Sequence, residues 1–206
     1  MSVLYMVLFS LGLQTAIVHD AAYSSTMPDL KELFLDLPPE HLTIVSSKEG
    51  RLFTREERAK LVKLVDQKNG YLEAVGNNDT DIFGGGYLAL FKKKDGGWLI
   101  GWKFDSNGDD TEHIQFFTKK GNQWTDVTKD VLPSLTQDMV NRRFLEKSKS
   151  KDKTKKLTDC ASGTYAWKLP RYGTNLEVYV ESDCWTGQGL ILWKLKFNGR
   201  TFEIQP

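Results

Sequence analysis

The chain has little of the chemistry on which metal proteins and many enzymes rely. Among its 206 residues are two cysteines, Cys160 and Cys184, and three histidines, His19, His41 and His113. None of these residues has the spacing of a zinc site, a catalytic triad or a redox-active CxxC pair. The sequence therefore predicts no metal, no cofactor and no catalytic residue.

An excess of charge of either sign is also missing. Lys and Arg number 28 and Asp and Glu number 27, whereas nucleic-acid-binding domains usually carry a basic excess. The stretch from Arg142 to Lys156 is basic, and contact with nucleic acid or an anionic glycan is one interpretation of it. Beyond Phe144 it has no aromatic residue for base stacking, so a solvated linker is favoured and no nucleic-acid partner is predicted.

No apolar run is long enough for a comfortable membrane span. The run from Val3 to Val18 is typical of a signal-peptide core, and Ala22-Tyr23-Ser24 supplies a small-x-small cleavage site. We therefore predict that residues 1–24 are a signal peptide cleaved after Ser24, or alternatively after Ala21. The protein would be secreted or periplasmic, with no stable membrane span after leader removal. Because no basic residue precedes the run, an upstream start, an uncleaved anchor and a buried first helix are alternatives.

The two cysteines flank a predicted hairpin, Tyr165 to Leu169 and Asn175 to Glu181. This hairpin would return both sulfurs to one edge of a sheet. A Cys160–Cys184 disulfide would stabilise the fold by roughly 3 kcal/mol and agrees with export. Two free, buried thiols are the alternative.

One order of elements occurs twice, an amphipathic helix followed by a four-strand meander. The copies span Phe53 to Thr128 and Ser134 to Ile204, after a short helix from Asp29 to Leu37. The pattern predicts an α+β fold with an N-terminal unit at 25–132 and a C-terminal unit at 133–206. The units are either a duplication sharing one long curved sheet, which we favour, or two meanders made alike by general β-sheet rules.

In the first unit, Thr54 and Glu57 form a capping-box pattern, which predicts a helix that ends near Asn69-Gly70. In the strand Trp98 to Asp105, apolar residues recur at every second position, which predicts a half-buried strand. The remaining predicted strands are Tyr87 to Lys92, His113 to Thr118 and Trp124 to Thr128.

The second unit is predicted to begin with a helix from Leu135 to Phe144. Besides the hairpin between the cysteines, its strands are Leu190 to Phe197 and Thr201 to Ile204. Asn198-Gly199 joins these last two strands and is typical of a two-residue type I′ turn.

Several segments resemble ion-binding or phosphate-binding loops. The segments Asp66 to Glu73, Asn77 to Asp81 and Asp105 to Asp110 alternate acidic and amide residues, but none combines the ligands and the glycine of a calcium loop. Gly84-Gly85-Gly86 precedes a strand, whereas phosphate loops lead into helices. We interpret all four segments as solvated turns or strand entries.

The chain is rich in aromatic residues and has six tryptophans. Alternation along strands assigns Trp98, Trp102 and Trp193 to core packing. Trp185 follows Cys184 and precedes Thr186-Gly187, a pattern that is typical of a loop. We predict that Trp185, with Tyr172 and Tyr179, forms an aromatic surface for a sugar or a protein partner.

The order of a leader followed by two helix-plus-meander units resembles beta-lactamase inhibitory protein and related tandem-repeat exported bacterial proteins. The resemblance is one of layout and assigns no contact residue. The predicted function is an exported, non-catalytic binding or protein-interaction module with an unidentified protein or glycan partner. One alternative is an extracytoplasmic hydrolase of envelope or extracellular polymer that uses carboxylates such as Asp105, Asp109 or Glu112. The other is a structural envelope component.

Overall fold

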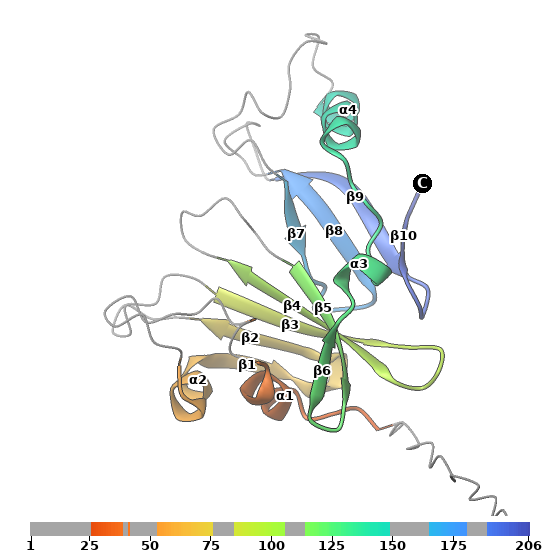
Figure 1. Ribbon diagram of the computed structural model, residues 1–206. Coiled ribbons are helices and arrows are strands. Elements are labelled where there is room, and N and C mark those ends of the chain that lie inside the picture. Colours follow the sequence, from red (N-terminus) through yellow and green to blue (C-terminus); the bar gives the residue numbers. More distant parts are fainter. Residues whose placement is uncertain are drawn as a thin grey trace, which may run out of the picture.

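The computed structural model describes residues 26–38, 41, 53–75, 85–105, 114–148, 165–180 and 189–206. The α+β class predicted from the sequence is confirmed, with helices on two antiparallel sheets (Figure 1). The helices are α1 Leu30–Asp36, α2 Arg55–Leu61, the 3₁₀ helix η2 Gln67–Asn69, α3 Thr128–Val131 and α4 Gln137–Ser148. The strands are β1 Val62–Asp66, β2 Tyr71–Val75, β3 Gly85–Lys92, β4 Trp98–Asp105, β5 Ile114–Lys120, β6 Gln123–Asp126, β7 Ala166–Lys168, β8 Asn175–Val180, β9 Leu190–Phe197 and β10 Phe202–Ile204.

The strands form two separate sheets. One has six strands in the order β1-β2-β3-β4-β5-β6, and the other has four in the order β10-β9-β8-β7. The favoured prediction of one long curved sheet is therefore wrong, although each half does form an antiparallel meander. The second unit has its four predicted strands, whereas the first has two strands more than predicted.

Of the two extra strands, β1 comes from the segment that the sequence assigned to a helix, and β2 begins within Asp66 to Glu73, which was interpreted as a solvated turn. The capping box is present, with Glu57 N donating to Thr54 Oγ1 at 3.2 Å and Thr54 N donating to Glu57 Oε2 at 2.8 Å, but α2 ends at Leu61. From Val62 onward the chain is strand β1, which turns through Gly70 (φ 69°) into β2. A seven-residue helix gains little from propensity, so the tertiary pairing of a Val-rich segment overrides the helical pattern.

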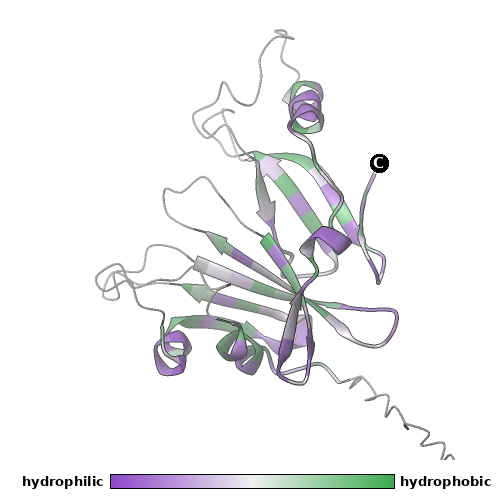
Figure 2. Cartoon of the chain, in the orientation of Figure 1, coloured by the Kyte–Doolittle hydropathy of each residue, from purple (hydrophilic) through white to green (hydrophobic). Residues whose placement is uncertain are grey.

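The six-stranded sheet is the middle layer of the molecule. Its lower face in Figure 1 packs against α1 and α2 through Leu72, Leu88, Ile100, Trp102 and Phe117. Its upper face meets the four-stranded sheet through Ala89, Phe91, Leu99, Ile114 and Phe116. Strand β4 is therefore buried on both faces, and the prediction of a half-buried strand is wrong. Figure 2 shows the alternation of polar and apolar residues along the strands.

The two sheets share a core of aromatic side chains. Phe202 of β10 packs against Phe91 and Phe116, with ring centroids 5.1 and 5.0 Å apart. The core-facing side of the four-stranded sheet carries Trp167, Leu176, Val178, Leu195 and Phe197. Its other side carries Lys168, Glu177, Tyr179 and Lys194, so this sheet has one apolar face and one polar face.

The helix predicted from Leu135 to Phe144 is present as α4, which lies over β9. Val140 and Phe144 are buried, and Arg143 Nε donates to the Leu192 carbonyl oxygen at 3.1 Å. The basic stretch that begins at Arg142 therefore starts on a packed helix, and its part from 149 to 156 lies outside the described residues.

Two turn predictions can be compared with the structure. Gly85 and Gly86 begin strand β3, as the strand-entry interpretation expects, and Gly86 lies directly against the indole of Trp102. The turn after β9 has four residues, 198–201, because Phe197 pairs with Phe202, so the predicted two-residue turn is wrong. Asn198 Oδ1 accepts from the backbone N–H groups of Arg200 and Thr201, and these bonds stabilise the longer turn.

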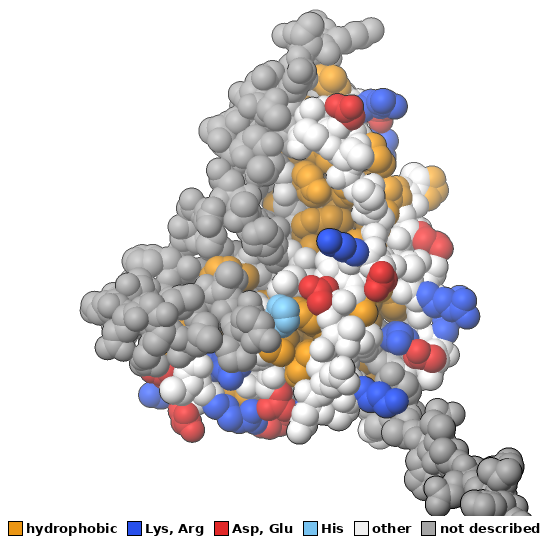
Figure 3. Space-filling model, viewed as in Figure 1, with side chains coloured by type: hydrophobic (Ala, Val, Ile, Leu, Met, Phe, Trp, Pro, Cys, Tyr) orange, Lys and Arg blue, Asp and Glu red, His pale blue; other side chains and the backbone are white. Residues whose placement is uncertain are grey.

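On the face shown in Figure 3, Lys and Arg side chains alternate with Asp and Glu around the lower part of the described surface, and no region of one sign dominates there. Over the described residues, no helix is both long and apolar enough to span a membrane.

Candidate ligand pocket between the two sheets

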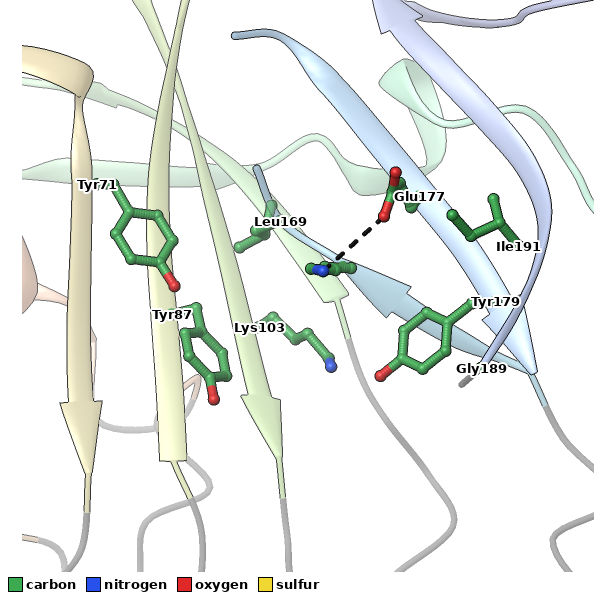
Figure 4. A pocket seen from close by; sticks show the side chains of 9 residues that line it. Tyr71, Tyr87, Lys103, Leu169, Glu177, Tyr179, Gly189 and Ile191 are labelled. Carbon is green, nitrogen blue, oxygen red and sulfur yellow. Dashed lines mark ion pairs between the residues drawn. The ribbon is translucent and has the colours of Figure 1, made fainter. Parts of the chain in front are cut away.

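A pocket of about 460 Å³ lies in the angle between the two sheets. It is lined by the upper face of the six-stranded sheet and by the polar face of the four-stranded sheet (Figure 4). The lining residues are Tyr71, Tyr87, Lys103, Lys168, Leu169, Glu177, Tyr179, Gly189 and Ile191. Pockets of a few hundred Å³ are the size that small-molecule sites usually have.

The larger sheet contributes Tyr71 from β2, Tyr87 from β3 and Lys103 from β4. Tyr87 and Lys103 are paired across β3 and β4, so both side chains stand on the same face of the sheet. The rings of Tyr71 and Tyr87 are stacked, with centroids 6.3 Å apart and planes at 29°. These two strands therefore present an aromatic wall beside a lysine.

The smaller sheet contributes a cross-strand row of polar residues. Glu177 pairs with Lys168 on β7 and Lys194 on β9. Its carboxylate lies 4.0 Å from Lys168 Nζ and 3.4 Å from Lys194 Nζ. Tyr179 follows two residues later on β8, on the same face. This wall therefore combines an ion-paired carboxylate with a phenol ring.

Lys103 lies at the meeting point of the two walls and is only 4% exposed. Its Nζ is 5.9 Å from the ring centroid of Tyr179, within reach of a cation–π interaction. Figure 4 shows this amine and the hydroxyl group of Tyr179 directed toward the same space, with Tyr87 on the other side of Lys103. A lysine buried to this degree is uncommon in proteins, since burial removes the ammonium from water.

An ion pair outside the pocket ties the two sheets together. Arg171, in the turn between β7 and β8, donates from Nε to Asp66 Oδ2 at 3.1 Å. Hydrogen bonds from Asn69, and then the Arg171 guanidinium, lower the pKa of Asp66 below its usual value. The same pairing raises the pKa of Arg171. The carboxylate of this calcium-like segment therefore serves as a structural partner of the opposite sheet.

The sequence singled out three aromatic residues, and the structure describes two. Tyr179 lines the pocket. Tyr172 lies in the β7–β8 turn, is 66% exposed and stacks over the Arg171 guanidinium at 5.3 Å, away from the pocket lining. Trp185 and both members of the predicted disulfide, Cys160 and Cys184, lie outside the described residues.

Of the carboxylates named for the hydrolase alternative, Asp105 is the last residue of β4, and Asp109 and Glu112 lie outside the described residues. Among the described residues that line the pocket, Glu177 is the single carboxylate. Of the three histidines, His41 packs against Phe117, with ring centroids 4.7 Å apart, and His19 and His113 lie outside the described residues.

Sequence reasoning did not identify Tyr71, Tyr87 or Lys103 as site residues. Tyr71 belongs to the strand that was missed, and Lys103 was assigned to the solvent side of a half-buried strand. The alternation in Tyr71-Leu72-Glu73-Ala74-Val75 was the available signal for β2, and it places Tyr71 and Leu72 on opposite faces.

The pocket and the layered sheets define an α+β protein with a concave polar and aromatic site and without a recognised catalytic group among its described lining residues. No family model matches the chain, and the comparison with curated proteins gives no match. Among solved structures, the chain is similar to a domain of an uncharacterized protein from Porphyromonas gingivalis W83. The two share 15% sequence identity with a TM-score of 0.53, over 87% of this chain and 99% of that one, which shows a shared fold.

Proposed function

We propose that the protein is an exported, non-catalytic binding module that holds its ligand in the pocket between the two sheets. The observation that carries this proposal is the convergence of three tyrosines and a buried lysine from two different sheets on one cavity. Tyrosine combines a rigid apolar ring with a hydrogen-bonding group, which suits the recognition of sugars and of protein side chains.

The charged groups in the pocket also support binding over hydrolysis. Hydrolysis by paired carboxylates needs two acids whose environments push their pKa values apart. Glu177 is instead the single carboxylate among the described lining residues, and it lies within ion-pair distance of two lysines, Lys168 and Lys194. The described part of the lining therefore supplies an ion-paired carboxylate and no second acid.

Export is supported by the apolar run from Val3 to Val18 and the small-residue site that follows it. The layout resemblance to beta-lactamase inhibitory protein points the same way, toward an exported protein that acts by binding. A C-terminally tagged full-length chain, expressed in its source cells, tests export. We expect the mature protein in the extracytoplasmic fraction, with an N-terminus at Ser25 or, after the alternative cleavage, at Ala22. Unprocessed protein confined to the cytoplasm would refute this part of the proposal.

The binding function is tested by capture with matched tyrosine variants. Wild-type protein, Tyr179→Ala and Tyr172→Ala are immobilised and exposed to proteins and glycans of the extracytoplasmic fraction. Tyr179 lines the pocket, whereas Tyr172 is an exposed tyrosine outside it. We expect Tyr179→Ala to reduce capture at least about tenfold, as loss of a central aromatic contact does, while Tyr172→Ala binds like wild type. Equal capture by all three proteins would contradict the assignment of the pocket.

A further inference from the structure

We propose that the ion pair between Arg171 and Asp66 is a latch that closes one end of the pocket. The latch fastens residues 170–173 of the β7–β8 turn, here called the strap, to the six-stranded sheet. While the pair is formed, the strap covers this end of the cavity, and when the pair breaks, the strap moves away and the end opens. This inference rests on the proposed function, because it concerns access to the same pocket.

The strap begins at the pocket itself. Leu169, the residue before it, lines the pocket and is 5% exposed. Leu169 packs over the middle of the larger sheet, since a β-carbon added to Gly101 of β4 would lie 3.0 Å from Leu169 Cδ2. Figure 4 shows Leu169 and Tyr71 toward one end of the pocket and Gly189 toward the other. The strap therefore stands at the Leu169 end.

The strap then crosses the larger sheet along one cross-strand row. Register pairing connects Gly101 on β4, through β3, with Tyr71 on β2 and Asp66 on β1. Leu169 packs at the Gly101 end of this row, and Arg171 is bonded to Asp66 at its other end. These two points are three strand spacings apart, or about 14 Å. The strap therefore passes over the strand that carries Tyr71, a residue of the pocket lining.

The two halves of the latch are held to different degrees. The Asp66 carboxylate accepts hydrogen bonds from Asn69 N at 3.3 Å and from Asn69 Nδ2 at 3.0 Å, and its side chain is 15% exposed. The Arg171 side chain is 43% exposed. Within the described part of the chain, its bond to Asp66 is the one hydrogen bond or ion pair that joins the strap to the larger sheet. Asp66 is therefore the fixed half of the latch, and Arg171 is the half that can leave.

An ion pair of this exposure is weak enough to open without unfolding the protein. Pairs between partly exposed side chains favour the closed state by up to about fivefold, and salt weakens them. Both ends of the strap are anchored independently of the latch. Leu169 is buried before it, and the Thr174 carbonyl oxygen after it accepts from Phe197 N at 3.2 Å. Loss of the pair therefore frees the strap while β7 and β8 stay in place.

Two variants of the full-length protein break the latch from opposite sides. Asp66→Asn removes the charge of the fixed half, and Arg171→Met removes the guanidinium but keeps the bonds between Asp66 and Asn69. Glu146→Gln is the matched control, because it breaks the pair of Glu146 with Arg143 on α4, which has the same length of 3.1 Å as the latch.

Two measurements that need no ligand read the position of the strap. Order parameters from ¹⁵N relaxation at Tyr172 and Gly173 should lie near about 0.8 in wild type and fall toward about 0.6 in both latch variants. Relaxation enhancement by a dissolved gadolinium chelate reports solvent access to the Leu169 methyl groups and the Tyr71 ring. It should rise at least about twofold in both latch variants and stay unchanged in Glu146→Gln. Raising sodium chloride to about 1 M should produce part of the same rise in wild type and none in the latch variants.

Unchanged values in both latch variants would overturn the inference. A change confined to Asp66→Asn would also overturn it, because the loss of the Asn69 bonds would then be the cause. The wild-type comparison at low and high salt needs no variant, and equal enhancement at both salt concentrations would count against the latch in the same way. These results would leave the proposed function standing. Capture that is unaffected by Tyr179→Ala would instead refute the proposed function and leave the measured opening of the cavity in place.

Discussion

Replacing Gly86 with alanine is expected to destabilise the protein by about 2 kcal/mol, because the site has no room for a β-carbon. An added Cβ would lie 2.0 Å from Trp102 Cη2 and 2.6 Å from Cζ2. Non-bonded carbons rest about 3.5–4.0 Å apart, so the indole would have to move by roughly 1.5 Å. Trp102 is 1% exposed and packs against Phe34 of α1, with ring centroids 5.6 Å apart, so it has little space into which to move.

The size of the effect combines two opposing terms. Overpacking of a filled core costs about 1–3 kcal/mol, and an approach this close to a rigid ring belongs near the top of that range. Alanine recovers up to about 1 kcal/mol of the backbone entropy that glycine loses in a strand. The net loss of about 2 kcal/mol corresponds to a fall in melting temperature of about 4–8 °C for a domain of this size.

Urea unfolding followed by far-UV circular dichroism measures this loss. Trp102→Phe in the Gly86→Ala background supplies the control, because the smaller ring frees the space that the new methyl group needs. The indole N–H of Trp102 has no hydrogen-bond partner among the described residues, so phenylalanine forfeits no hydrogen bond. We expect the double variant to be more stable than the sum of the single effects by about 1 kcal/mol or more. A Gly86→Ala protein within about 0.5 kcal/mol of wild type, or strictly additive effects, would refute the packing argument.

Three further changes test other parts of the structure. Thr54→Ala removes the N-cap of α2 and should lower the free energy of unfolding by about 1 kcal/mol in urea titrations, whereas an unchanged midpoint would mean that the cap contributes nothing. Phe202→Ala opens the core shared by both sheets and should cost about 3–5 kcal/mol, measured by thermal unfolding; a loss below about 1 kcal/mol would show that the sheets do not depend on this contact. Asp66 has a lowered pKa through Asn69 and then Arg171, so its folded-state pKa is below the unfolded value of about 3.9. The free energy of unfolding of wild type should therefore exceed that of Asp66→Asn by its full amount above this pH, and the difference should shrink as the pH falls through the folded-state pKa of Asp66. A difference that grows in acid would contradict this expectation.

Local signals in the sequence were read correctly where one interaction decides the structure. The Thr54–Glu57 capping box forms as expected, and the period-2 strands from Trp98 to Asp105 and from Leu190 to Phe197 have the bounds that alternation predicts. A cap or an alternating strand depends on residues a few positions apart. Such features are visible without knowledge of the rest of the fold.

Features that depend on distant partners were missed. The pattern of Leu61, Leu64 and Val65 fits a helix as well as it fits the end of α2 followed by β1, and the pairing of β1 with β2 decides between them. Likewise, Lys103 alternates with Trp102 as a solvent-facing residue would. The four-stranded sheet covers that face and turns Lys103 into a buried pocket residue. The candidate site was therefore partly foreseen through Tyr179, while its other half depends on how the two sheets pack.

The location of the bound ligand on the protein tests the central claim most directly. A ligand eluted from the immobilised wild-type protein is titrated into ¹⁵N-labelled protein, and amide shifts are mapped onto the fold. The binding-module proposal predicts the largest changes at Tyr87, Lys103 and Tyr179, on both sides of the pocket. Changes centred on α1 and α2, with these three amides unmoved, would contradict it.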